Sequence, residues 1–164
     1  MVRVAWPVKR DGGSNERGDE VRSATTIATV AILTAIALLH AYWAGGGRLS
    51  IGAAVPSVGG VAAFRPSAAG TAAVALALLA AALLVAAVGD LIRPPGPNWI
   101  YVGAASVLAL IFAARAVGDF GLVGFFKTRG DGAFARLDTW VYSPLCLILA
   151  IAIAAIVVTR GDPS

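Results

Sequence analysis

Four apolar stretches, each about 20 residues long, dominate this chain and limit what it can fold into. They run over about 24–43, 70–92, 99–118 and 140–159. An α-helix needs about 20 predominantly apolar residues to cross the hydrocarbon core of a bilayer. Only 13% of the 164 residues are charged, against roughly 25% in soluble domains. The sequence therefore predicts an all-α integral membrane protein, folded as a bundle of four transmembrane helices.

The polar residues at the start of the chain predict a tail outside the membrane. Residues 1–22 are mixed in charge and interrupted by Gly and Pro, so we expect a disordered polar tail. Ser23 is placed to cap the first span, and residues 23–160 are expected to form a single transmembrane domain. The segment 48–67 is apolar but broken by Gly and Pro, which favours a re-entrant or interface-lying segment over a further crossing.

The distribution of basic residues predicts how the bundle is oriented. Four spans place both termini on one side, which carries seven Lys or Arg: five in the tail, Arg93 and Arg160. The other side carries five. By the positive-inside rule we expect a multi-pass protein of the plasma membrane with cytoplasmic termini. The lipid bilayer is the expected partner, and the net charge of +4 fits anionic headgroups rather than nucleic acid.

Polar and aromatic residues gather at one membrane face, where the first and third spans end and the second and fourth begin. The candidate binding-site residues on this face are His40, Tyr42, Trp43, Arg115, Asp119, Arg136, Asp138 and Tyr142. Charged groups at membrane depth cost at least a few kcal/mol unless they are paired or hydrated, and they often mark functional sites. Arg115 and Asp119 are four residues apart, so on a continuing helix they could form an ion pair. A purely structural network of such pairs is the alternative interpretation.

The sequence offers little for metal or cofactor chemistry. One histidine, one cysteine and one methionine cannot make a zinc site of the usual spacing, so we expect neither a metal nor a cofactor. Cys146 has no partner for an internal disulfide and is expected to be a small buried residue. The glycines at 118, 121 and 124 predict a tight turn rather than contacts with a ligand.

Three motifs resemble a bacterial membrane-protein family known as domain of unknown function 3995. They are LLHAYWAGGGR at 38–48, FAARAVGDFGLVGFFK at 112–127 and FARLDTWVYSPLCLILA at 134–150. The resemblance covers about residues 24–159. It implies a small multi-span protein of a bacterial inner membrane and supplies no activity. It also marks the positions of the polar face as the family's shared residues.

The sequence leaves three functions open, and it does not decide whether the protein is an enzyme. The first is binding or modification of a lipid, an isoprenoid-like molecule or another hydrophobic small molecule at the polar face, with His40 as a candidate acid or base. The second is a structural or accessory subunit whose alanine-rich helices dock onto a membrane-protein partner or onto another copy of the chain. The third is a small transporter, which the lack of an acidic residue in the first span disfavours.

Overall fold

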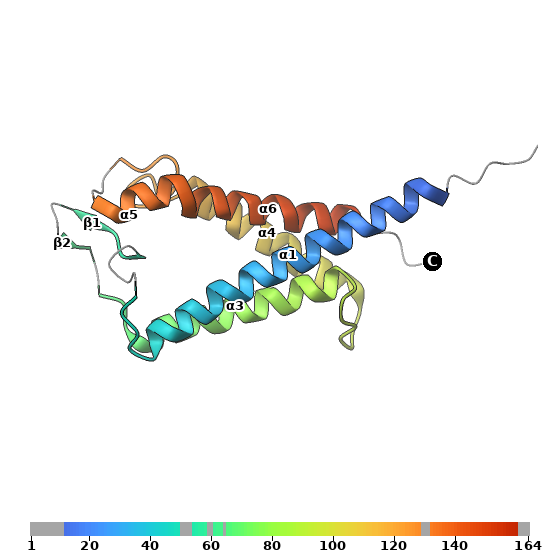
Figure 1. Ribbon diagram of the computed structural model, residues 1–164, viewed down its shortest axis with the longest axis horizontal. Coiled ribbons are helices and arrows are strands. Elements are labelled where there is room, and N and C mark those ends of the chain that lie inside the picture. Colours follow the sequence, from blue (N-terminus) through green and yellow to red (C-terminus); the bar gives the residue numbers. More distant parts are fainter. Residues whose placement is uncertain (1–11, 50–53, 59–60, 64, 129–131, 161–164) are drawn as a thin grey trace, which may run out of the picture.

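The computed structural model describes residues 12–49, 54–58, 61–63, 65–128 and 132–160, with the side chains of the first helix described from Glu16 onward. The elements are α1 (Gly12–Ala44), β1 (Ser57–Val58), β2 (Val61–Ala62), α3 (Ala68–Val88), α4 (Asn98–Val117), α5 (Gly132–Leu137), the π-helix η1 (Asp138–Tyr142) and α6 (Ser143–Val158) (Figure 1). Four helices are long and apolar enough to cross a membrane, the last running without a break from α5 through η1 to α6. The predicted all-α, four-span fold is confirmed, and it is compatible with a multi-pass membrane protein.

The first helix starts earlier than the sequence indicated. Residues 12–22, expected to belong to a disordered tail, form the first turns of α1, and Ser23 lies inside the helix rather than at its cap. This corrects the predicted boundary, while residues 1–11 lie outside the described residues. Extending an existing helix costs far less than nucleating a new one, and Arg22 fixes the extension by pairing with Asp90 at 2.7 Å. At 33 residues, α1 is about 50 Å long, well beyond the roughly 30 Å hydrocarbon core.

The helices pack as two pairs, α1 along α3 and α4 along α6. The pairs lie together near the start of α1 and the end of α6, and they diverge toward the end that holds β1, β2 and α5 (Figure 1). Their contact is filled by apolar side chains from all four helices. The most buried members of this core are Leu33, Val85, Val88, Ala105, Leu149, Ile153 and Ile156.

Small residues let the helices of a pair approach closely, as they do in many membrane bundles. Thr26 of α1 is fully buried, and its hydroxyl donates a hydrogen bond to the carbonyl of Arg22. Its polar group is therefore paired. A side chain at Gly89 would overlap Thr26, which shows how close the end of α3 lies to α1.

The outer surface is apolar: the exposed fractions of Leu76 and Leu110 are 67% and 68%. Such a surface suits contact with lipid rather than with water.

The segment between α1 and α3 contains the two-residue strands β1 and β2, which pair antiparallel. They lie at the same end of the molecule as α5 (Figure 1). Whether this segment re-enters or rests on the membrane stays a prediction. What the fold does establish is that the loops joining α1 to α3 and α4 to α5 share one end of the bundle.

Candidate functional site

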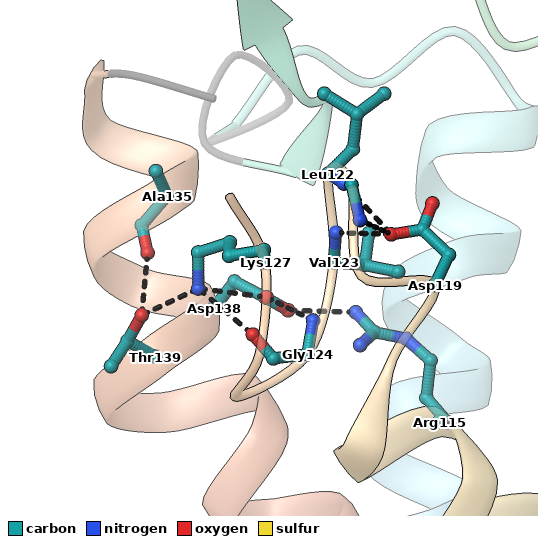
Figure 2. Close-up of polar contacts among 10 residues, drawn as sticks. Arg115, Asp119, Leu122, Val123, Gly124, Lys127, Ala135, Asp138 and Thr139 are labelled. Atoms are coloured by element: carbon teal, nitrogen blue, oxygen red, sulfur yellow. Dashed lines mark hydrogen bonds and ion pairs between the residues drawn. The ribbon is translucent and has the colours of Figure 1, made fainter. Parts of the chain in front are cut away.

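The most deeply buried charged group at the loop end is Asp138, the first residue of η1. Its side chain is 0% exposed and receives three hydrogen bonds (Figure 2). Arg115 donates from Nη2 to Oδ1 at 2.8 Å, the backbone amide of Gly124 donates to Oδ2 at 2.7 Å, and Lys127 donates from Nζ to Oδ2 at 3.2 Å. We call these four residues the Asp138 cluster. It joins the end of α4, the following loop and the start of the last span.

Glycine makes this cluster possible. At Gly118, just after α4, the backbone has φ +92°, and a side chain there would overlap the carbonyl of Val123. The chain therefore leaves the helix at once and folds back, so that the amide of Phe125 donates to the carbonyl of Ala116 at 2.9 Å. This return brings Gly124 and Lys127 to Asp138. The prediction of a tight glycine-dependent turn is confirmed at Gly118, where no other residue fits without strain.

The predicted ion pair between Arg115 and Asp119 is wrong. Because α4 ends at Val117, Asp119 does not lie one turn above Arg115. Asp119 instead accepts hydrogen bonds at Oδ1 from the backbone amides of three residues: Gly121 at 2.8 Å, Leu122 at 2.7 Å and Val123 at 3.1 Å (Figure 2). These amides, led by that of Val123, lower the pKa of the exposed Asp119 carboxyl from its ordinary value. Asp119 thus stabilises the loop, while Arg115 pairs with Asp138.

His40 and Trp43 line a separate pocket of about 400 Å³ at the end of α1, which we call the His40 pocket. The ring of His40 contacts that of Trp43 edge-on, with centroids 5.1 Å apart. His40 Nδ1 lies 2.8 Å from the carbonyl oxygen of Ile36. Trp43 donates from Nε1 to the carbonyl of Leu49 at 2.8 Å. The rest of the pocket comes from the loop and the start of α3: Ala54, Val55, Arg65, Pro66, Ser67, Gly70, Thr71 and Val74.

The other predicted site residues lie around these two groups. Tyr42 is 50% exposed, and its ring packs over Gly47. Arg136 is exposed on α5 and makes no hydrogen bond or ion pair with any described residue. Tyr142 stacks at a tilt on Phe134, with ring centroids 6.0 Å apart. Cys146, expected to be buried, is only partly covered.

The structure divides the residues of the predicted polar face into two groups. The end of α1, which carries the His40 pocket, and helix α5, beside the Asp138 cluster, lie on different helix pairs and well apart at the open end of the bundle (Figure 1). Asp138 has both oxygens occupied by fixed donors, so the cluster is suited to anchoring a loop rather than to moving a proton. Within the described part of the chain, no group of three His, Cys, Asp or Glu could hold a metal ion.

Two basic residues of these groups were not among the candidate site residues predicted from the sequence. Lys127 completes the Asp138 cluster and also donates to the hydroxyl of Thr139. Arg65 lines the His40 pocket. Both lie in loops, where basic residues were used to predict the orientation of the bundle. Neither lies on a predicted helix, so spacing along a helix could not indicate its partner. What the sequence did indicate is that both loops lie on the same membrane face as His40 and Arg115.

Comparison with known proteins identifies a family but no activity. No curated protein and no solved structure matches the chain. A family model described as "Protein of unknown function (DUF3995)" matches residues 33–153. The match takes in the end of α1, the Asp138 cluster and most of the core, and it confirms the family that the three sequence motifs indicated. The chain therefore belongs to the DUF3995 family of proteins of unknown function.

Proposed function

We propose that this protein binds an acidic amphiphile, a lipid or isoprenoid-like molecule, with its head in the His40 pocket. The observation that carries the proposal is the composition of that pocket. Imidazole and guanidinium groups from His40 and Arg65 are combined with the apolar surfaces of Trp43, Val55 and Val74. Ligand pockets are characteristically mostly apolar, with a few polar groups that fix orientation.

Arg65 is the group best suited to hold an acidic head. Its side chain is exposed and makes no hydrogen bond or ion pair with any described residue. A guanidinium offers a planar set of donors that matches carboxylate and phosphate oxygens. An anion bound here would therefore replace water around Arg65 without breaking an existing protein contact.

His40 is oriented by its own helix. Since a carbonyl oxygen can only accept a hydrogen bond, the contact with Ile36 requires the proton on Nδ1. In the neutral ring, Nε2 is then the acceptor, and no described residue occupies it. His40 can thus receive a hydroxyl or an acidic proton of a head group while Arg65 binds its negative charge.

The position of the pocket suits an amphiphile rather than a small soluble anion. It lies between the last turn of α1 and the first turn of α3, where two membrane spans end. Trp43 already uses its Nε1 hydrogen bond, so it presents an apolar ring, as tryptophan does at membrane interfaces. Val74 lies further along α3 toward the membrane interior. A head at Arg65 would leave its tail free to follow the helices into the bilayer.

The test is mass spectrometry of the small molecules and lipids that the purified protein retains in mild detergent. We expect one acidic amphiphile in the wild type, its loss in Arg65→Gln, and its reduction in His40→Ala. Arg48→Gln is the matched control, because Arg48 is an exposed arginine of the same loop that does not line the pocket.

Retention of the same bulk phospholipid by all four proteins would contradict the proposal. A co-purifying protein at fixed stoichiometry, with no selected lipid, would also contradict it and would favour the accessory subunit. Trp43 provides a second readout, since its fluorescence should change saturably when the retained molecule is returned to delipidated protein carrying Trp6→Phe, Trp99→Phe and Trp140→Phe.

A further inference from the structure

A second group of charges lies at the opposite end of the bundle, away from the His40 pocket. Arg22 of α1 donates from Nη1 to Oδ2 of Asp90 at 2.7 Å. Arg160, after α6, donates from Nη2 to Oδ1 of Asp90 at 3.2 Å and to Oδ1 of Asn98 at 3.2 Å. We call these four residues the Asp90 cluster. It holds together the ends of α3 and α6 and the start of α4, all against α1.

The positive charge of the Asp90 cluster exceeds its negative charge. Two guanidiniums share one carboxylate, since Asn98 is neutral. Asp19 approaches Arg22 only to 4.0 Å and is 65% exposed, so it contributes little. Nε of Arg22 and Nη1 of Arg160 are buried and have no hydrogen-bond partner among the described residues. Donors of this kind are costly unless an acceptor reaches them.

A pocket of about 640 Å³ opens between the first turns of α1 and the last turn of α6. Arg17 and Arg22 supply its positive charge, while Val21, Ala155 and Ile156 supply apolar walls. The hydroxyls of Thr25 and Thr159, which also line it, already donate to the carbonyls of Val21 and Ala155. The pocket is therefore basic at one part of its lining and apolar along the rest.

The acidic residues of the α1 extension face away from this pocket. A helix turns about 100° per residue. On that spacing the pocket residues from Arg17 to Thr25 share one face of α1, and Glu16, Asp19 and Glu20 fall on the opposite face. None of the three acids lines the pocket. The charge that an occupant meets is therefore set by the two arginines.

We propose that this pocket binds the headgroup of an anionic phospholipid, with the phosphate on Arg17 and Arg22 and an acyl chain along Val21, Ala155 and Ile156. Phosphate oxygens pair well with guanidinium donors, and anionic lipid is attracted to basic residues beside a membrane span. A free phosphate would leave the apolar walls uncovered, so the charge and the walls together favour a lipid. This site does not depend on the ligand of the His40 pocket.

The experiment is native mass spectrometry of the full chain in detergent, titrated with dioleoyl phosphatidylglycerol or dioleoyl phosphatidylcholine. All proteins carry Arg65→Gln, so that binding at the His40 pocket does not contribute to the difference. We expect phosphatidylglycerol to bind in preference to phosphatidylcholine, and Arg17→Gln to weaken its binding about fivefold. Arg17 makes no ion pair with a described residue, so its loss should leave the fold intact.

Two further variants separate the charge from the apolar wall. Arg93→Gln removes an exposed arginine from the same end of the bundle, outside the pocket, and should leave binding unchanged. Ala155→Trp should fill the pocket and weaken binding while both arginines remain. Equal binding of the two lipids, an equal loss in Arg93→Gln, or full displacement of the lipid by inorganic phosphate would each overturn the proposal.

Discussion

The two ends of the bundle use the same arrangement of charges at different depths. At each end one carboxylate accepts hydrogen bonds from two basic side chains. The groups are Asp138 with Arg115 and Lys127 at the loop end, and Asp90 with Arg22 and Arg160 at the other end. The side chain of Asp138 is 0% exposed, whereas that of Asp90 is 38% exposed. The two clusters therefore have the same kinds of ion pairs and differ in how deeply their carboxylate is buried.

Sequence separation is the second difference. Asp138 lies 23 and 11 residues from Arg115 and Lys127, so its cluster fixes a local loop between consecutive spans. Asp90 lies 68 and 70 residues from its two arginines, so its cluster joins the first and last spans. A buried ion pair is costly to break on one side, because the remaining charge stays unpaired. A partly exposed pair is worth about 1 kcal/mol or less. The local cluster should therefore matter more to stability than the one that spans the chain.

The largest effect is expected for Asp138→Asn. It leaves the largely buried Lys127 and the partly exposed Arg115 facing a buried neutral amide. We expect the free energy of unfolding to fall by about 3–5 kcal/mol. Thermal or detergent unfolding followed by circular dichroism measures this loss. The matched control is Asp19→Asn, since Asp19 is 65% exposed and makes only a 4.0 Å contact.

A second variant tests whether the loss comes from unpaired charge. Adding Lys127→Met to Asp138→Asn removes one of the two stranded cations and should recover part of the stability. A loss no larger than that of Asp19→Asn, or no recovery in the double variant, would contradict the assignment of Asp138 as the anchor of the loop.

A smaller effect is expected for Asp90→Asn at the other end. Because water reaches this carboxylate, we expect a loss of about 1 kcal/mol in low salt, reduced further at high salt. The same unfolding measurement, made at both salt concentrations beside Asp138→Asn, compares the two clusters directly. If Asp90→Asn costs as much as Asp138→Asn, burial does not explain the difference between the ends.

The span positions could be predicted because the bilayer imposes them. Length and hydropathy indicated about 70–92 and 99–118, and the helices are Ala68–Val88 and Asn98–Val117. The start of α1 could not be predicted in the same way. Residues 12–22 carry no apolar signal, and the contact that fixes them, between Arg22 and Asp90, joins residues 68 positions apart.

The candidate sites were predicted less completely for a similar reason. Topology placed Arg115 and Asp138 on one membrane face, where the structure pairs them. It placed His40 in the same group, but the His40 pocket lies on the other helix pair. The partner of Arg115 was misassigned because spacing rules for ion pairs hold only on a continuing helix, and Gly118 ends this one at φ +92°. Arg65 and Lys127 belong to loops, whose paths depend on contacts that spacing does not encode.

The smallest effect is expected for Asp119, the exposed carboxylate beside the Asp138 cluster. Its pKa is lowered by the amides of Val123, Gly121 and Leu122, so its ionised form is the one that the folded loop favours. A lowered folded pKa contributes stability above the unfolded pKa and loses it as the pH falls through the folded pKa. The amide proton shifts of Gly121, Leu122 and Val123, followed by NMR, should titrate together below the ordinary range of aspartate. In Asp119→Asn this titration should disappear while global unfolding changes little. Amides that titrate at or above the ordinary value, or that keep their titration in the variant, would show that Asp119 does not organise the loop. The loop beside Asp138 would then be held by the buried Asp138 cluster and not also by the hydrogen bonds to Asp119.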